Sequence, residues 1–542
     1  MCGIWCHIGP CKEKIDHNQL VSHLVARGPE GTRVIHVDPL VTFGFTRLAI
    51  NGLTEAGMQP YIQGPISWIC NGEIYNSREL EVDLGLEKTG SDCECIGALY
   101  LRHRDDLATF ARALDGVFAI TLYDTERELL IVTRDPYGVR PLFVGVSVHE
   151  GGHIFASEMK ALGSDKDLAY IRPVAPGSIE VYNVKSIELV QVIQYHSVPW
   201  ITNQVFNLFD KDNTLMSVRF ALENAVRKRL FTERPVAALL SGGLDSSLIA
   251  SLVQKMLKGF GLPALKTFSI GFKGSSDLAH ARIVANWIKS DHTEIVMTPD
   301  EFFSAIPEVI KAIESYDTTT VRASTGNYLI AEKIREQTGC KVVFNGDGAD
   351  ELFGGYLYFN NAPNDQAFHA ETGRLLENIH TFDVLRSDRS ISSNGLEART
   401  PFLDKQFVAL VRSIPPALLK PVRGQQMEKF ILRSAFDDGI TLPEEVLWRR
   451  KEAFSDGVSS PEKAWFQEIQ ERVASVVPAD WKSDKKFIEH VAPRTPEEYY
   501  YRSLFNTYYG PLYEKVTVPY RWMPRWSPET TDPSARTLNV YS

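Results

Sequence analysis

The pattern of hydrophobic and polar residues divides the chain into two parts of different construction. Through residues 1–190, short apolar runs such as 67–70, 117–123 and 129–133 alternate with Asn-Gly, Asp-Gly and Pro-Tyr-Gly sequences. Apolar runs of this length, bounded in this way, are typical of β-strands joined by turns. The first part is therefore predicted to be rich in β-structure.

The pattern changes to a helical one at residue 214. From there apolar side chains recur on one helical stripe, formed by Val218, Leu222, Ala225, Val226 and Leu230. The polar stretch 203–213 before it is typical of a linker. We therefore predict a first domain over residues 2–190, a linker over 191–213 and a second domain over 214–542.

The second part alternates strand and helix signals. Strand-like apolar runs occur at 236–240, 267–270 and 341–344, and a helix is predicted over 248–257. Because parallel strands need long crossover connections, such alternation indicates an open, largely parallel sheet flanked by helices.

Composition narrows the class of protein. The 542 residues are 44% hydrophobic and 23% charged, which excludes a disordered, collagen-like or coiled-coil chain. The 58 basic and 68 acidic side chains sum to −10, so neither nucleic acid nor a membrane is expected as a partner. No apolar run approaches the ~18 residues of a membrane helix, and no secretion signal is visible. The odd count of seven cysteines then indicates reduced thiols in a cytoplasmic, cytosolic protein.

Candidate chemistry starts at the first two residues, Met1-Cys2. A methionine before a small residue is commonly removed, and Cys2 would then carry a thiol and a free α-amine. An α-amine titrates near ~7.7–8.0 and can accept the thiol proton, so such a residue can act as a nucleophile. Taken alone, a cysteine at position 2 is more often fortuitous, so this interpretation depends on the motifs that follow.

Further motifs stand in order at 27–29, 45–49, 71–76, 91–92, 115–119 and 134–142. Together with Cys2 they resemble the class II glutamine amidotransferase domain, an N-terminal-nucleophile (Ntn) hydrolase with an αββα sandwich. The resemblance implies that Cys2 is the catalytic nucleophile, with the Asn71 amide and the Gly72 N–H stabilising the oxyanion. Taken alone, Asn71-Gly72 is typical of a hairpin turn. The implied glutamine-binding residues are Arg47, Leu48, Ala49, Ile50, Asn51, Asn71, Gly72, Glu73 and Asp92. Among them Arg47 suits the carboxylate of glutamine, and Asp92 suits its ammonium.

A glycine-rich loop follows the first predicted strand of the second part, with the sequence Ser241-Gly242-Gly243-Leu244-Asp245-Ser246-Ser247. Its backbone N–H groups, its hydroxyls and the N-terminus of the next helix form an anion-binding cradle. The loop lacks the lysine of the G-x-x-x-x-G-K-[ST] motif and resembles the pyrophosphate-binding (PP) loop of ATP pyrophosphatases. The implied ATP-binding residues are Leu239, Ser241, Gly242, Gly243, Asp245, Ser246, Ser247, Ile270, Asn345 and Gly346.

An acidic loop at 345–351 follows the predicted strand 341–344. Because ligands bind at the carboxyl ends of parallel strands, Asp245 and Asp350 are expected to hold Mg²⁺ on the pyrophosphate of ATP. Lys451 is expected as a catalytic cation near the phosphates. Arg322 and Arg399 are weaker candidates for contact with substrate or phosphate. The alternatives are a solvated turn for the loop and a surface position for the lysine.

Motifs at 316–324, 382–389, 395–404, 448–457 and 532–536 extend the resemblance along essentially the whole chain, to the glutamine-dependent asparagine synthetases. The implied fold class is α/β (α+β), an Ntn sandwich followed by a parallel-sheet PP-loop ATP pyrophosphatase domain. The implied activity is that of a carbon–nitrogen ligase. It converts aspartate to asparagine through a cysteine thioester and β-aspartyl-AMP, with glutamine, ATP and Mg²⁺. An internal ammonia tunnel is also implied, and a homodimer is left open.

The chain departs from this family in the loop 345–351. The family usually has Ser-Gly-Glu-Gly-Ser-Asp-Glu, whereas this chain has Asn345-Gly346-Asp347-Gly348-Ala349-Asp350-Glu351. The family glutamate implicated in the acyl-adenylate step is therefore replaced by Asp347, which is one methylene shorter. Two alternatives follow, a non-catalytic homologue and an enzyme of altered specificity such as the β-lactam synthetases. The presence of Cys2, Asp245 and Asp350 argues against a non-catalytic homologue. Cys2 argues against the β-lactam synthetases, whose first domain usually lacks the nucleophilic cysteine.

Overall fold

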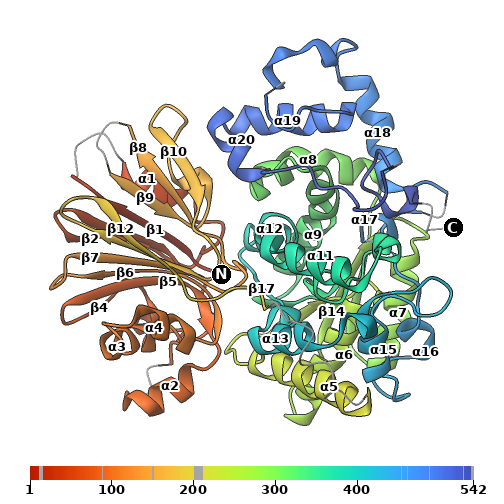
Figure 1. The fold of residues 1–542 in the computed structure, drawn as a ribbon, viewed down its shortest axis with the longest axis horizontal. Coiled ribbons are helices and arrows are strands. Elements are labelled where there is room, and N and C mark those ends of the chain that lie inside the picture. The colour runs from red at the N-terminus through yellow and green to blue at the C-terminus, as the bar shows by residue number, and fades with distance from the viewer. Residues whose placement is uncertain are drawn as a thin grey trace.

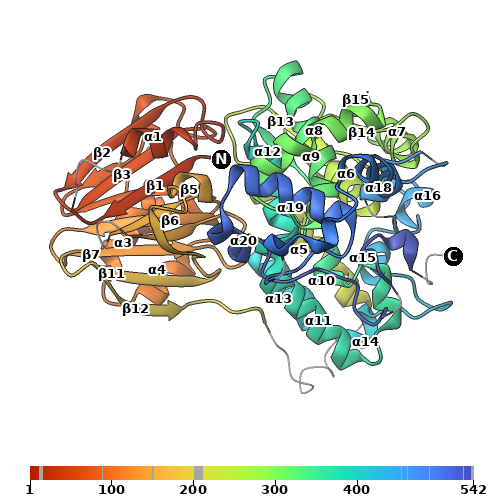
Figure 2. The same cartoon turned by 90° about the horizontal axis from the view of Figure 1, so that it is seen from above.

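The structure is a computed structural model that describes residues 1–10, 16–87, 90–148, 152–199, 211–452, 454–460, 462–487, 489–528 and 530–538. We call residues 1–199 the N-terminal part and residues 211–538 the C-terminal part. The strand-rich N-terminal part and the helix-rich C-terminal part lie side by side (Figures 1 and 2). The first residues of the chain lie where the two parts meet in both views.

Two six-stranded antiparallel sheets stack face to face in the N-terminal part. Their strand orders are β10-β8-β9-β1-β3-β2 and β12-β11-β7-β6-β5-β4. The strands of the first sheet are β1 (Gly3–Ile8), β2 (Thr32–Asp38), β3 (Val41–Thr46), β8 (Phe143–Ser147), β9 (His153–Ala156) and β10 (Leu168–Pro173). Those of the second are β4 (Tyr61–Gln63), β5 (Ile66–Ile74), β6 (Gly116–Asp124), β7 (Leu129–Arg134), β11 (Ser178–Asn183) and β12 (Glu188–Gln194). Side chains alternate between the faces of a strand, so Ile4, Cys6 and Ile8 of β1 fill the space between the sheets.

Helices cover the outer faces of this sandwich. Helix α1 (His17–Ser22) packs on the first sheet, whereas α3 (Cys95–Arg102) and α4 (Leu107–Ala113) pack on the second. Helix α2 (Ser77–Leu84) lies beside α3. The order of layers is therefore αββα, as predicted.

The prediction of a turn at Asn71-Gly72 is wrong, because both residues lie inside β5. This strand pairs with β6 along its whole length from Ile66 to Ile74. A Cβ atom on Gly72 would come within 2.3 Å of the Val117 carbonyl oxygen. Glycine is therefore required here for the close approach of β6, and it does not mark a turn.

A five-stranded parallel sheet forms the centre of the C-terminal part, in the order β15-β14-β13-β16-β17. Its strands are β13 (Val236–Leu239), β14 (Lys266–Gly271), β15 (Asp291–Val296), β16 (Val342–Phe344) and β17 (Glu397–Arg399). Ala237 of β13 packs in the cluster of α8 and α9, and Ala238 packs in the cluster of α5 and α6. Both faces of the sheet are thus covered by helices, as parallel sheets require.

The helices of this part are α5 (Lys211–Lys228), α6 (Leu244–Gly259), α7 (Ser276–Ile288), α8 (Pro299–Ile313), α9 (Thr318–Gln337), α10 (Ala349–Phe353), α11 (Asp365–Asn378), α12 (Asp383–Ser392), α13 (Lys405–Ser413), α14 (Pro416–Leu419), α15 (Phe430–Ala435), α16 (Glu444–Leu447), α17 (Phe454–Gly457), α18 (Trp465–Val476), α19 (Pro496–Tyr508) and α20 (Pro511–Thr517). The predicted fold class is confirmed.

Some predictions fall at the edge of the described residues. Of the predicted linker, residues 191–194 belong to β12 and 211–213 to α5, and 200–210 lie outside the described residues.

The six cysteines that the structure describes are free thiols, and Cys11 lies outside this set. Among the described helices, none combines the length and the apolar character that crossing a membrane requires.

Candidate active sites

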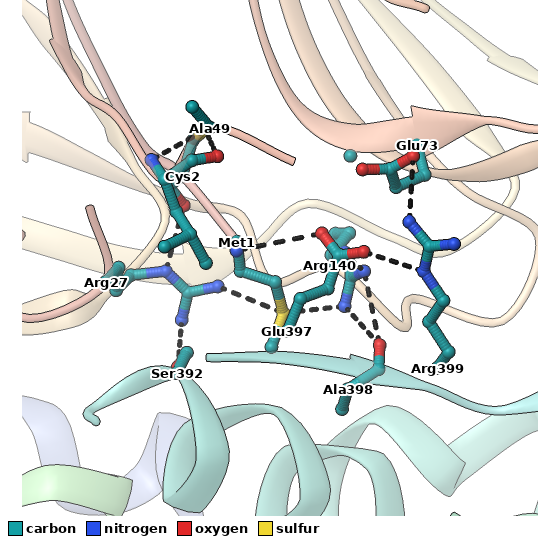
Figure 3. Close-up of polar contacts among 12 residues, drawn as sticks. Met1, Cys2, Arg27, Ala49, Glu73, Arg140, Ser392, Glu397, Ala398 and Arg399 are labelled. Atoms are coloured by element: carbon teal, nitrogen blue, oxygen red, sulfur yellow. Dashed lines mark hydrogen bonds and ion pairs between the residues drawn. The ribbon is translucent and has the colours of Figure 1, made fainter. Parts of the chain in front are cut away.

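Cys2 lies directly before β1, at the boundary between the two parts (Figure 3). Its sulfur atom lies 3.5 Å from the Leu48 nitrogen and 3.6 Å from the Leu48 oxygen. Burial raises the pKa of the Cys2 thiol to about 11, and the N-terminal ammonium opposes this rise. A thiol with so high a pKa is a weak nucleophile unless a base lies next to it.

Met1 is buried at the same boundary. Its amino nitrogen lies 3.7 Å from Glu397 Oε2, and its sulfur contacts the guanidinium groups of Arg27 and Arg140 (Figure 3). Removal of Met1 would place the α-amine on Cys2 itself, in the position that an N-terminal nucleophile needs for a base.

The Asn71 side chain is fully buried on β5. Neither its amide nitrogen nor its amide oxygen has a hydrogen-bond partner among the described residues. A buried amide without partners costs free energy, and active sites are one place where such a donor is kept. The arrangement is compatible with the oxyanion role predicted for Asn71.

The predicted glutamine-binding residues come from three segments that the fold brings together: 47–51, 71–73 and Asp92. The Asn51 amide donates to Glu73 Oε2 at 3.0 Å, and the Ile74 N–H donates to Asp92 Oδ2 at 2.8 Å. Burial raises the pKa of Asp92 to about 6 and raises the pKa of Glu73 well above its usual value. The site thus contains carboxylates whose charge state depends on their partners.

Arg47, in the first of these segments, is held by backbone groups. Its guanidinium donates to the carbonyl oxygens of Thr54 and Gly52, at 2.8 and 2.5 Å. These bonds fix the plane of the guanidinium group, which is the geometry needed for a bidentate contact with a carboxylate.

Strand β17 of the C-terminal part lies next to Glu73, one of the predicted glutamine-binding residues, across the boundary (Figure 3). Arg399 of this strand donates to Glu397 Oε1 at 2.9 Å, and its Nη2 lies 3.2 Å from Glu73 Oε2. Arg27 of the N-terminal part contacts the C-terminal part, because its Nη1 donates to Asp388 of α12 at 2.8 Å. Its Nε donates to the Cys2 carbonyl at 3.1 Å.

Arg322 and Arg399, the weaker candidates for contact with substrate or phosphate, are both buried in ion pairs. Arg399 is buried under the N-terminal part. Arg322 is buried between two carboxylates, Glu497 and Asp532. These pairs could not be predicted from the sequence, because Glu73 lies far from Arg399, and Glu497 and Asp532 lie far from Arg322, along the chain.

A cavity of about 240 Å³ lies at the carboxyl ends of β13, β14 and β16. The predicted residues that line it are Leu239, Ser241, Gly243, Asp245, Ser246, Ile270, Asn345, Gly346, Asp347, Asp350 and Lys451. Gly242 and Ser247 do not line it. Gly242 has a φ of 73°, and a Cβ atom there would come within 2.5 Å of the Ala281 nitrogen, so this position supports the loop from behind.

The loop 345–351 packs directly on the glycine-rich loop. A Cβ atom on Gly346 would come within 2.7 Å of the Ser246 nitrogen, so the two backbones are in contact. Within the first loop, the Ser241 and Ser246 hydroxyl oxygens are 2.9 Å apart. Helix α6 begins at Leu244 and directs its first N–H groups toward this loop, which suits an anion.

Asp347 is held by a residue that the sequence did not single out for a role. Arg386 of α12 donates to Asp347 Oδ1 at 2.8 Å and also contacts Asp383. Asp347 Oδ2 has no hydrogen-bond partner in the part of the chain that the structure describes. The neighbouring Asn345 amide donates to the Ser387 hydroxyl at 2.7 Å.

Two lysines and two aspartates that line the cavity form a cluster of ion pairs. The Lys429 ammonium lies 2.5 Å from Asp245 Oδ2 and 2.6 Å from Asp350 Oδ1. The Lys451 ammonium lies 2.6 Å from Asp350 Oδ2. Burial alone would raise the pKa of Asp350, but the two ammonium charges hold it well below its usual range. Sequence reasoning missed Lys429, because the residues before it carry neither a strand end nor a glycine-rich motif.

Comparison with known proteins agrees with this two-site arrangement. The family model described as "Glutamine amidotransferase domain" matches residues 1–213, and the model described as "Asparagine synthase" matches residues 217–371 and 360–527. These matches define the class, an amidotransferase joined to a synthetase in one chain. The asparagine synthetase [glutamine-hydrolyzing] of Gallus gallus is 41% identical over 571 residues, and the enzyme of that name from Rattus norvegicus is 40% identical over 566. Each alignment covers 100% of this chain and 99% of the relative.

The chain therefore belongs to the family of glutamine-hydrolysing asparagine synthetases, which are carbon–nitrogen ligases. The fold class and the overall function predicted from the sequence are confirmed. The comparisons give no support to a non-catalytic or altered-specificity homologue.

Proposed function

We propose that this protein forms asparagine from aspartate, using glutamine as the ammonia donor and ATP as the activating substrate, and releases glutamate, AMP and pyrophosphate. The observation that carries the proposal is the presence of two separate sites in one chain. One is the cluster around Cys2 and the unpartnered Asn71 amide, and the other is the cavity over the glycine-rich loop.

In the first site the Cys2 thiol attacks the side-chain amide of glutamine. The Cys2 α-amine, freed by removal of Met1, accepts the thiol proton. The Asn71 amide and the Gly72 N–H stabilise the tetrahedral oxyanion. It collapses to a thioester as the α-ammonium returns its proton to the departing ammonia, and water then hydrolyses the thioester to glutamate and restores the thiol. Arg47 holds the carboxylate of glutamine, and Asp92 and Glu73 hold its ammonium.

In the second site the glycine-rich loop binds the phosphates of ATP, and the aspartate carboxylate attacks the α-phosphate. A carboxylate does not accept ammonia directly near neutral pH, so the acyl-adenylate is a necessary intermediate. Lys451 lines the same cavity and would stabilise the charge that develops on the phosphates. Asp347 also lines the cavity and would accept a proton from the attacking ammonia.

Asp245 and Asp350 are suited to hold Mg²⁺. Both supply hard oxygen ligands, and Asp245 Oδ1 has no hydrogen-bond partner among the described residues. When bound, Mg²⁺ would neutralise the charge of the pyrophosphate leaving group. The free thiols support a cytosolic location, and the homodimer stays a prediction from the family resemblance.

Product analysis tests the proposal. The protein is incubated with aspartate, ATP and Mg²⁺, and with either glutamine or ammonia. We expect asparagine, AMP and pyrophosphate in equal amounts from both nitrogen donors. ADP as the stoichiometric product would show that the nucleotide chemistry is different. Formation of an amide other than asparagine would show that the substrate is different.

A further inference from the structure

Lys429 occupies the space between the two carboxylates that we propose as metal ligands. Its ammonium lies 2.5 Å from Asp245 Oδ2 and 2.6 Å from Asp350 Oδ1, and its side chain is 1% exposed. Asp245 lies in the first turn of α6 and Asp350 in the first turn of α10, so one cation connects the two helix starts that follow β13 and β16. An ammonium that bridges two carboxylates takes the place that a divalent cation would take.

The fold builds this position from unusual backbone. Lys429 has a φ of 58°, in the left-handed region that a residue other than glycine seldom adopts. Opposite it lies Gly355, where a Cβ atom would come within 2.1 Å of Lys429 Cε and 2.2 Å of Asp350 Oδ1. A side chain at position 355 would therefore exclude the lysine from this place. Strained backbone kept at a site is commonly linked to its function.

The charges of this cluster balance without a metal ion. Asp245 and Asp350 carry two negative charges, and Lys429 and Lys451 carry two positive charges. A divalent cation added to this cluster would be repelled by both ammonium groups at short range. Nucleotide phosphates bring the negative charge that is missing, and they also offer Lys429 a new partner.

We propose that Lys429 holds the metal position in the nucleotide-free enzyme and yields it to the divalent cation only when the phosphates of ATP arrive. Metal and nucleotide then bind as a coupled pair, and the empty site discriminates against free metal ions. This inference rests on the ATP and metal sites of the proposed function. It adds to them a residue that excludes the metal until the substrate is present.

Binding of Mn²⁺, followed by electron paramagnetic resonance of the free ion, tests this directly. The proteins are the full-length wild type, Lys429→Met, Lys429→Arg and the control Lys228→Met. Lys228 is matched, because its ammonium also lies between two aspartates, Asp115 and Asp404, but it does not line the cavity. Each protein is titrated without nucleotide and with a non-cleavable ATP analogue.

We expect the nucleotide-free Lys429→Met variant to bind Mn²⁺ at least tenfold more tightly than wild type, because two carboxylates lose their internal cation. Lys429→Arg and Lys228→Met should bind as weakly as wild type. With the ATP analogue, wild type should bind Mn²⁺ at least tenfold more tightly than without it. Circular dichroism and the melting temperature report whether each variant is folded.

The outcomes separate the inference from the proposed function. If wild type binds Mn²⁺ with the analogue but folded Lys429→Met gains nothing without it, Lys429 does not exclude the metal and the inference is wrong. If wild type binds Mn²⁺ equally with and without the analogue, the inference is also wrong. If wild type binds no Mn²⁺ even with the analogue, the proposed metal site fails and the inference fails with it. Should Lys429→Met fail to fold, Lys429→Gln, which also removes the ammonium, takes its place with the same expected and contradicting results.

Discussion

Arg399 Nη2 lies 3.2 Å from Glu73 Oε2, although the two residues belong to different parts of the chain. Both side chains are almost completely buried, so the pair is shielded from water. Burial raises the pKa of Glu73, the nearby Asp92 and Glu397 raise it further, and Arg399 opposes them. The C-terminal part therefore helps to set the charge of a carboxylate that we propose to bind glutamine.

Replacement of Arg399 should reduce glutamine binding as well as stability. Arg399→Met leaves Glu73 and Glu397 buried without this guanidinium, and breaking a buried pair in this way costs about 3–5 kcal/mol. The pKa of Glu73 should then rise further, because Arg399 opposes its protonation, and a protonated Glu73 attracts the ammonium of glutamine less. We expect the KM of the glutaminase reaction to rise about tenfold or more, measured as glutamate release without aspartate or ATP.

Arg322→Met is the matched control for this variant. Arg322 is likewise buried between two carboxylates, Glu497 and Asp532. Both carboxylates belong to the C-terminal part, and neither is a predicted glutamine-binding residue. It should lower the melting temperature comparably and leave the KM for glutamine unchanged. Equal KM values for the two variants would show that Arg399 has a structural role only.

The parts of the site that follow from local sequence were predictable, and those that depend on distant contacts were not. The loops at Ser241 and Asn345 follow apolar strands, and parallel topology brings such loops together at one sheet edge. Lys429 could not be found in this way, because it reaches Asp245 across 184 positions of sequence. Asn71-Gly72 was misread because the dipeptide has the same composition in a turn and in a strand that another backbone approaches closely.

The two half-reactions should separate on substitution of the thiol. Cys2→Ala removes the nucleophile, and no other residue combines a thiol with the terminal α-amine. We expect loss of glutaminase activity and of glutamine-dependent synthesis, with ammonia-dependent asparagine formation kept. Both activities are measured on the same preparation. Glutamine-dependent synthesis by Cys2→Ala would mean that the nucleophile has been assigned wrongly.

Glutamine affinity should fall in acid because of Asp92. Burial raises the pKa of this carboxyl to about 6, from an ordinary value of 3.8. Below that pH Asp92 becomes neutral, and we expect affinity to fall toward tenfold for each further pH unit. Glutamine binding is measured by calorimetric titration of Cys2→Ala between about pH 5 and pH 8. This variant lacks the thiol, so glutamine is not hydrolysed during the titration. With Asp92→Asn added, binding should be weak and should lose this dependence.

The same shift has a defined sign for stability. Between the ordinary pKa of Asp92 and its raised value, the folded protein binds a proton that the unfolded chain does not. The contribution of Asp92 therefore makes folding less favourable as the pH rises through about 6. The free energy of unfolding of Asp92→Asn and of the parent is measured at about pH 5 and about pH 7. Relative to the parent, Asp92→Asn should be more stable at the higher pH, because the parent then carries a buried charge at Asp92.

Asp347 provides the sharpest test of the second site, because it replaces a longer family residue. Its Oδ1 accepts from Arg386 at 2.8 Å, and its Oδ2 has no hydrogen-bond partner within the described chain. A proton acceptor must lie within roughly 2.6–3.2 Å of its target, or one water away. The free Oδ2 is the atom that can meet this requirement.

Asp347→Asn keeps the size of the side chain but removes its charge. We expect asparagine synthesis to fall by about 10²–10⁴, the range typical of a lost general base, while glutaminase activity is kept. Asp347→Glu should keep synthesis, and should raise it if a water now bridges the missing methylene. Pyrophosphate release and asparagine formation are measured separately, because release without asparagine would place Asp347 in the ammonia step. Full synthesis by Asp347→Asn would leave Asp347 as an ordinary partner of Arg386, and the proton acceptor would have to be sought elsewhere in the cavity.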